Sequence, residues 1–412
     1  MRSPSPLLCL ALAFIIGLHA KGQQKTSSPY VAQCLRADSL PIVFNVDRQT
    51  SKTGESWVIR NAEERIRVTD ILRKGDSLFA DMPVFESNFR LQEQKDGRLT
   101  GDWVKGTSAD DVAQPVVFRP GTVRFPVTRG KAKADVNGRW KVTFTRADGS
   151  PRYAVAEFSQ KGERLTGTFV TPSGDYRYLE GILSGDSMQL SCFDGSHAYY
   201  FGAKLEGKDR IVNGVFASGI RFLERWTAVR DPKASVDAST ARTEMRPGEE
   251  RLSFRFPDLD SNLVSIDDAR FRGKVVVIQI MGSWCPNCMD ETAFLSEYHR
   301  KNRQRGVEML ALAYEYSTDF ARASKSLDKF RKRYNVEYPM LITGVSSADT
   351  LRTEKTLPGL TPIRVFPTTI FIDSQGKVAK VHPGFAGPAT GSHHEEYVRE
   401  FEATVKGLLE GI

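Results

Sequence analysis

The sequence lacks several features that would place it in a common class. It carries no basic cluster or array of aromatic residues of the kind that binds nucleic acid, although its formal net charge is +8. Beyond the first 22 residues, no segment is long and apolar enough to cross a bilayer. The five cysteines and six histidines show no spacing that would give a zinc ion two pairs of ligands. These absences argue against a nucleic-acid-binding protein, a membrane-spanning protein and a metal site.

The first 22 residues predict an export signal. Arg2 supplies a positive charge, residues 7–18 form an apolar core, and Ala20-Lys21-Gly22 offers a cleavage site of small residues. We therefore expect a soluble, periplasmic protein from which Cys9 has been removed. The remaining cysteines then work outside the cytosol, where a reduced pair needs a dedicated electron source. They are Cys34, Cys192, Cys285 and Cys288.

Residues 30–230 predict an all-β domain. Short β-prone runs such as residues 65–71 and 140–144 alternate between polar and apolar side chains, with turn residues between them. Arg98-Leu99-Thr100-Gly101 recurs as Arg164-Leu165-Thr166-Gly167, an echo that repeated hairpins or an old duplication would produce. The expected shape is a barrel or a two-sheet sandwich. Such a domain can enclose a ligand, but we favour a scaffold or docking surface.

The pattern changes after residues 231–251, a polar stretch with two prolines that predicts a linker. From residue 252 to residue 412, predicted strands and helices alternate. Residues 275–280 predict a central parallel strand that is apolar on both faces, and a helical pattern runs from Pro286 to about Arg305. The β-α-β then β-β-α order of residues 252–412 is the thioredoxin arrangement, which predicts an α/β domain.

Two cysteines separated by two residues stand between that strand and that helix, in Trp284-Cys285-Pro286-Asn287-Cys288. This position is typical of a redox pair. Cys285 is expected to cap the helix, with Pro286 as the first helical residue, where a missing N–H group costs nothing. Free N–H groups at the helix start would lower the thiol pKa from about 8.5 toward roughly 3.5–7.5. We therefore expect Cys285 to be a thiolate exposed for attack.

Residues 252–412 resemble the TlpA/ResA-like thiol-disulfide oxidoreductases, thioredoxin-superfamily proteins of the AhpC/TSA-redoxin type. The resemblance depends on residues 271–275 (FRGKV), residues 284–288 (WCPNC), Phe366-Pro367-Thr368-Thr369 and residues 371–377 (FIDSQGK). It implies that Cys285 is the nucleophile, Cys288 the resolving thiol and Pro367 a cis-proline that helps to bind an extended substrate. Trp284, Pro286 and Phe366 are the expected substrate contacts, although Phe366 replaces the smaller residue common before this proline. From the residues alone, Pro367 could equally be an ordinary proline at the start of a strand.

Glu291 is the candidate proton acceptor for Cys288. It follows Cys288 by three residues and therefore lies on the same helical face. The TlpA/ResA-like family often has a glutamate at this offset. The alternative is an exposed first-turn glutamate that interacts with the helix dipole. Gln279 occupies the strand position where cytosolic thioredoxins carry a buried aspartate. Because glutamine cannot accept a proton as that aspartate can, Glu291 is the stronger candidate for this role.

These observations predict an exported thiol-disulfide oxidoreductase that reduces protein disulfides through Cys285 and Cys288, with no further cofactor. Its expected partners are disulfide-containing exported proteins and a membrane thiol donor of the cytochrome-maturation or disulfide-reduction type, as the resemblance implies. One alternative is a ligand- or partner-binding β-domain protein with a redox-regulated thioredoxin module. Another is a disulfide oxidant or isomerase, which would use the same residues at another redox potential. Whether Cys34 pairs with Cys192 stays open.

Overall fold

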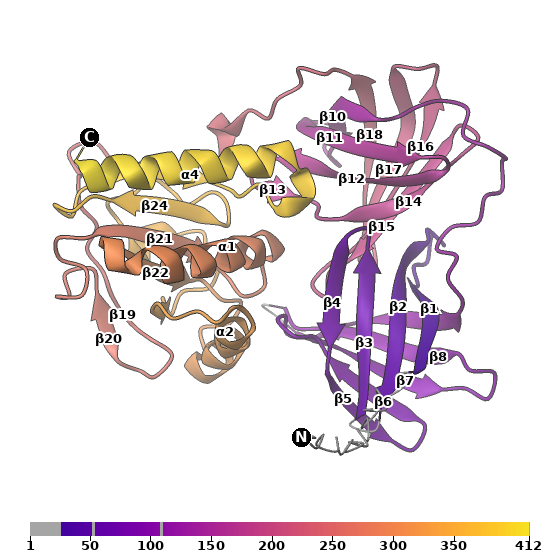
Figure 1. Cartoon of the computed structure of the whole chain (residues 1–412), viewed down its shortest axis with the longest axis horizontal. Helices are drawn as coiled ribbons and strands as arrows, with labels where there is room; N and C mark the ends of the chain where they lie inside the picture. The colour runs from indigo at the N-terminus through magenta and orange to yellow at the C-terminus, as the bar shows by residue number, and fades with distance from the viewer. Residues whose placement is uncertain (1–25, 52–53, 108–109, 412) are drawn as a thin grey trace, which may run out of the picture.

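The computed structural model describes residues 26–51, 54–107 and 110–411. The predicted export signal at residues 1–22 therefore lies outside the described residues. Two antiparallel sheets come first along the chain, and an α/β domain follows (Figure 1). Among the described residues, no helix is both long and apolar enough to span a membrane.

The first sheet has the strand order β4-β3-β2-β1-β9-β8-β7-β6-β5 and is antiparallel throughout. The predicted strand at residues 65–71 is split at Thr69 into β4 and β5, which stand at opposite ends of this order. The chain itself thus joins the two ends of the sheet, which wraps around a core rich in aromatic residues such as Trp57 and Phe89. Its strands are β1 (Thr26–Cys34), β2 (Ile42–Ser51), β3 (Gly54–Asn61), β4 (Glu64–Val68), β5 (Asp70–Lys74), β6 (Ser77–Asp81), β7 (Ser87–Glu93), β8 (Leu99–Lys105) and β9 (Val112–Pro120).

The second sheet closes by hydrogen bonding, because β11 pairs with both β10 and β12. Its inward-facing residues, among them Trp140, Phe169 and Trp226, form a core separate from that of the first sheet. The prediction of an all-β region with barrel-like sheets is therefore confirmed. The strands are β10 (Gly138–Thr145), β11 (Pro151–Lys161), β12 (Arg164–Thr171), β13 (Gly174–Asp175), β14 (Leu179–Ser184), β15 (Ser187–Phe193), β16 (Ala198–Glu206), β17 (Arg210–Ser218) and β18 (Phe222–Arg230).

The segment after β18 crosses to the α/β domain. It contains the short 3-10 helix η1 (Ala238–Ala241), and Met245 forms an isolated bridge with Leu360. The small hairpin of β19 (Arg255–Pro257) and β20 (Leu263–Ser265) then opens the α/β domain.

The α/β domain is built on a five-stranded sheet of order β23-β22-β21-β24-β25, in which β22 runs parallel to β21 and β24 antiparallel to it. This arrangement confirms the thioredoxin-like fold. Its strands are β21 (Val275–Met281), β22 (Val307–Ala313), β23 (Met340–Ile342), β24 (Thr368–Ile372) and β25 (Val378–Pro383). Its helices are α1 (Pro286–Asn302), α2 (Phe320–Tyr334), α3 (Arg352–Thr356) and α4 (Ser392–Glu410), with 3-10 turns η2 (Arg303–Arg305) and η3 (Pro388–Thr390).

Helices α1, α2 and α4 contribute to one core beside the sheet, and α3 with the β19–β20 hairpin borders the other. Every residue of β21 is buried, as expected for a central strand covered on both faces. Because side chains alternate along a strand, Gln279 faces the same side as Val277 and Met281, which pack in the core under α1. A buried amide is thereby placed directly beneath the start of the helix.

Candidate active site

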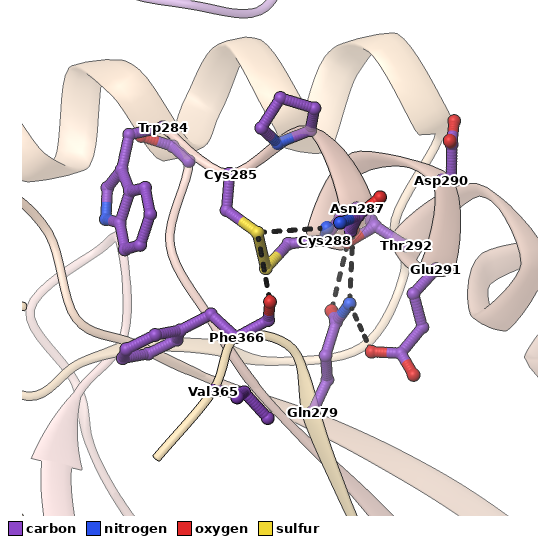
Figure 2. Close-up of a disulfide and its surroundings, with 12 residues drawn as sticks. Gln279, Trp284, Cys285, Asn287, Cys288, Asp290, Glu291, Thr292, Val365 and Phe366 are labelled. Carbon is purple, nitrogen blue, oxygen red and sulfur yellow. Dashed lines mark hydrogen bonds between the residues drawn. A yellow bond between two sulfur atoms is a disulfide. The ribbon is translucent and has the colours of Figure 1, made fainter. Parts of the chain in front are cut away.

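Cys285 and Cys288 form a disulfide at the junction of β21 and α1 (Figure 2). Cys285 has the extended backbone of a helix cap (φ −100°, ψ 113°), and Pro286 is the first helical residue. The N–H group of Cys288 donates a hydrogen bond to Cys285 Sγ at 3.2 Å. In the reduced protein, the same donor and the positive end of the helix would stabilise a Cys285 thiolate.

Cys285 is buried, with 4% of its surface exposed, so the expectation that it is open to attack is wrong for this state. Cys288 is completely buried. Turns of the second β-sheet also contact the residues around the disulfide. Ser196 Oγ donates to the carbonyl oxygen of Trp284 at 3.1 Å. Gly174 lies so close to Asn287 that a Cβ atom at this glycine would overlap the Asn287 amide.

Arg177 joins all three parts of the chain in one buried ion-pair network. Its guanidinium donates to the carboxylate of Glu64 in β4 and, at 2.5 Å, to Asp290 Oδ2 in α1. It also donates to the carbonyl oxygen of Pro286 at 3.2 Å, between the two cysteines. Only 4% of the Arg177 side chain is exposed, and burial raises the pKa of Asp290 to about 7 although the guanidinium opposes that rise. Arg177 has a φ of +57°, which a non-glycine residue adopts only when its surroundings hold it there.

Replacing Arg177 with alanine is expected to loosen the cover over the disulfide. Removing one partner of a buried ion pair costs about 3–5 kcal/mol, because the remaining charges lose their compensation. Since every 1.4 kcal/mol is a factor of ten, we expect the reduced variant to react with an alkylating reagent at Cys285 at least about tenfold faster than wild type. The measurement is the rate of Cys285 modification, followed by mass mapping.

The matched control is Arg210→Ala, which removes an ion pair with Glu206 in which both side chains are more than half exposed. Exposed pairs contribute only about 0–1 kcal/mol. Its Cys285 modification rate should equal that of wild type. Equal rates in Arg177→Ala and wild type would show that the Arg177 network does not restrict access.

The predicted cis-proline lies opposite the disulfide. The Phe366–Pro367 peptide bond is cis, and the carbonyl oxygen of Phe366 lies 3.7 Å from Cys285 Sγ. The rings of Trp284 and Phe366 pack with their centroids 5.3 Å apart. The indole N–H of Trp284 donates a hydrogen bond to the carbonyl oxygen of Tyr314. Trp284 and Phe366 lie beside Cys285 (Figure 2). Pro286 directly follows Cys285 as the first helical residue, and Pro367 follows Phe366 through the cis peptide bond.

Glu291 is completely buried in α1 behind the disulfide, so the alternative of an exposed glutamate is wrong. Three side chains donate hydrogen bonds to its carboxylate: Thr369 at 2.5 Å, Tyr397 at 2.9 Å and Gln279 at 2.9 Å. Burial nevertheless raises the pKa of Glu291 to about 7, against the lowering effect of these donors. A carboxyl with this pKa exchanges protons readily at neutral pH.

Gln279 links Glu291 to the redox helix. Its amide N–H₂ group donates to the carbonyl oxygen of Cys288 at 3.2 Å as well as to Glu291, and its amide oxygen accepts from Thr292. Thr369 stands directly across from Gln279 in the pairing of β21 with β24, so two neighbouring strands orient the same carboxylate. The position of Gln279 in the strand could be read from the sequence, but its role in orienting Glu291 could not.

Glu315 is a second buried carboxyl near the redox pair, and it was not among the residues predicted for the site. It accepts hydrogen bonds from the backbone N–H of Ser283 at 2.8 Å and from the Ser283 hydroxyl at 2.5 Å. Burial raises its pKa to about 7. Its place two residues after the apolar strand β22, at the same end of the sheet as the cysteines, is the signal that could have identified it. It holds the loop that leads into Cys285.

Cys34 and Cys192 are both buried and both free thiols, each in the core of a β-sheet. Burial raises the pKa of each thiol far above its ordinary value, which suppresses the reactive thiolate. Within the described ranges, no three His, Cys, Asp or Glu side chains are placed to hold a metal ion.

The known proteins that are similar to this chain match its α/β domain. Residues 246–397 match the family model described as Redoxin. The thiol-disulfide oxidoreductase ResA of Bacillus thuringiensis subsp. konkukian is 29% identical over 161 residues, which are 39% of this chain and 82% of that protein. ResA of Halalkalibacterium halodurans is 28% identical over 166 residues, 40% of this chain and 80% of that protein.

Solved structures also show similarity to part of the chain. A thiol:disulfide interchange protein of the thioredoxin family from Chlorobium tepidum is 21% identical with a TM-score of 0.29, and the match covers 40% of this chain and 99% of that one. A thiol-disulfide oxidoreductase from Bacteroides fragilis is 16% identical with a TM-score of 0.28, and the match covers 36% of this chain and 99% of that one.

Proposed function

The C-terminal domain is a TlpA/ResA-like thiol-disulfide oxidoreductase domain of the thioredoxin superfamily, and we propose from this that the protein reduces disulfides in exported proteins. The observation that carries the proposal is the placement of Cys285 at a helix start, with Cys288 and the buried acid Glu291 behind it. The reducing direction and the export follow the resemblance of residues 252–412 and the predicted signal at residues 1–22.

The proposed reaction has two exchange steps. The thiolate of reduced Cys285 attacks one sulfur of the substrate disulfide, a mixed disulfide forms, and the other substrate sulfur leaves as a thiolate that takes a proton from water. Cys288 then gives its proton to Glu291, and its thiolate attacks Cys285 Sγ. The second substrate sulfur leaves as a thiolate and takes up a proton, which protonated Glu291 can return. Two electrons have passed to the substrate, and the Cys285–Cys288 disulfide has formed.

The oxidised pair must be reduced again before another cycle. Outside the cytosol, the glutathione and thioredoxin systems that keep thiols reduced are absent. We propose that a membrane protein with a dithiol supplies the two electrons by the same exchange in reverse. Either partner has to reach Cys285, which is 4% exposed, so the β-rich cover must move when a large protein reacts.

The direction of transfer can be measured with one protein substrate in both redox states. Reduced full-length protein is mixed with equimolar disulfide-bonded insulin, and oxidised protein with reduced insulin, both at pH 7. A reductase should oxidise more than half of its Cys285–Cys288 pair in the first mixture and regenerate little dithiol in the second. Extensive disulfide formation in insulin in the second mixture would instead establish an oxidant.

A further inference from the structure

A large cavity lies between the second β-sheet and the α/β domain, next to the redox pair. Its volume is about 960 Å³. The β-sheet contributes Arg152 and Tyr176 to its wall, and the α/β domain contributes Asn287 and Val365. Asn287 stands between the two cysteines, and Val365 precedes Phe366 of the cis-proline segment (Figure 2). The cavity therefore ends at the residues that flank the disulfide.

Positive charge predominates in the wall of this cavity. Four arginines line it: Arg146, Arg152, Arg352 and Arg364. Arg152 forms an ion pair with Glu224, whereas the other three have no carboxylate within ion-pair distance among the described residues. Arg352 donates to the carbonyl oxygens of Ser347, Asp349 and Ile363, and Arg146 to that of Pro151, so these guanidinium groups have hydrogen-bond partners but no neutralising charge. Guanidinium groups without an ion-pair partner in a concave, low-dielectric wall attract carboxylates more strongly than they would on an open surface.

Two carboxyl groups in the same wall offset only part of this charge. Asp175 already accepts hydrogen bonds from the backbone N–H groups of Gly387 at 2.8 Å and Arg177 at 2.6 Å, and burial raises its pKa. Asp237 caps η1, because its carboxylate accepts a hydrogen bond from the backbone N–H of Ser239. Neither carboxyl forms an ion pair with Arg146, Arg352 or Arg364.

Tyrosine rings provide the apolar part of the wall. Tyr176 and Tyr199 contact each other edge to face with centroids 5.3 Å apart, and Tyr153 is 59% exposed. Tyrosine offers a rigid apolar face and a hydroxyl group at low entropic cost, which suits contacts with an extended polypeptide. Arginine and tyrosine are, with tryptophan, enriched among the side chains that dominate binding at protein interfaces.

We propose that this cavity is a substrate-binding site that receives the residues flanking the reacting cysteine and selects extended protein segments with carboxylate side chains. This proposal rests on the proposed function, since it names the class of protein disulfide that reaches Cys285. The second β-sheet thereby supplies the specificity-determining half of the site. Arg146 lies on the β-sheet side of the cavity and Arg364 on the α/β side, one residue before Val365, so both charges can meet one bound segment.

Disulfide-linked peptide dimers test this selection. Three dimers have the same length and differ only in the residues around the cysteine, which are glutamate, glutamine or lysine. Each rate with the reduced full-length protein is divided by the rate of the same dimer with dithiothreitol, which corrects for intrinsic reactivity. We expect a corrected kcat/KM about tenfold higher for the glutamate dimer than for the glutamine dimer, lower still for lysine, with the preference decreasing as salt is added.

Two variants assign the preference to the cavity. Arg146→Gln combined with Arg364→Gln should reduce the ratio of glutamate to glutamine rates to below about twofold, and Arg364→Glu alone should shift the preference toward the lysine dimer. Arg255→Gln removes an exposed arginine on the β19 hairpin, outside the cavity, and should keep the wild-type ratio and rates.

The outcomes separate this inference from the proposed function. A wild-type protein that reduces all three dimers with equal corrected rates would overturn the inference and leave the reductase function intact. The same holds if the glutamate preference survives in the double variant. A failure to reduce any dimer, while dithiothreitol reduces them all, would overturn the proposed function itself.

Discussion

Replacement of Cys288 by serine should stop the reaction halfway, with the substrate attached to Cys285. Cys288 is completely buried, so its only accessible partner is the mixed disulfide formed next to it. In a single turnover with excess reduced variant, the first substrate thiol should appear at the wild-type rate. The second should appear at least about a thousandfold more slowly, since an essential nucleophile has been removed. The measurement is the time course of the two thiols in stopped flow.

Cys192→Ser is the control for this experiment, because it also removes one buried thiol but lies in the core of the second β-sheet. Its two substrate thiols should appear as in wild type. Release of the second thiol at the wild-type rate by Cys288→Ser would contradict the assignment of Cys288 as the resolving cysteine.

Glu291→Gln should slow the second exchange and leave the first intact. The variant keeps the size of the side chain but cannot accept a proton, and a positioned base contributes about 10²–10⁴-fold. We expect release of the second substrate thiol to fall by about a hundredfold at pH 8, measured as in the previous experiment. Unchanged release would remove Glu291 from the mechanism.

The pH dependence gives a second readout for Glu291. Because its pKa is raised to about 7, the carboxyl is protonated below that pH and cannot take the proton of Cys288. The wild-type rate of the second step should therefore rise as pH increases through about 7, and this rise should be absent in Glu291→Gln. Glu315→Gln is the matched control, since burial raises that pKa to about 7 as well but the carboxyl contacts Ser283 instead. It should keep the wild-type pH profile.

Local sequence signals predict much of the α/β domain. The apolar run at residues 275–280, the Cys285 cap and Pro286 lie within a few residues of one another, and short-range backbone chemistry determines the junction of strand and helix. The position of Glu291 beside Cys288 is also predicted from local sequence, since residues three apart in a helix lie on the same face. These predictions needed no knowledge of the rest of the chain.

The cover over Cys285 could not be predicted in the same way. Arg177 is separated by 113 residues from both Glu64 and Asp290, and no periodicity relates these positions. The sequence showed each of them as one charged residue among many. The division of residues 65–71 at Thr69 is similar, because alternating polarity persists through a strand that leaves one edge of a sheet and joins the other.

The role of Cys285 as the nucleophile can be tested by locating the covalent bond between enzyme and substrate. Reduced Cys288→Ser protein is mixed with a disulfide-bonded protein, quenched with acid, digested without reductant and mapped by mass spectrometry. We expect one substrate molecule per chain, bonded to Cys285 alone. Attachment at Cys34 or Cys192, or the absence of any adduct while substrate thiols still appear, would contradict the role of Cys285 as the nucleophile.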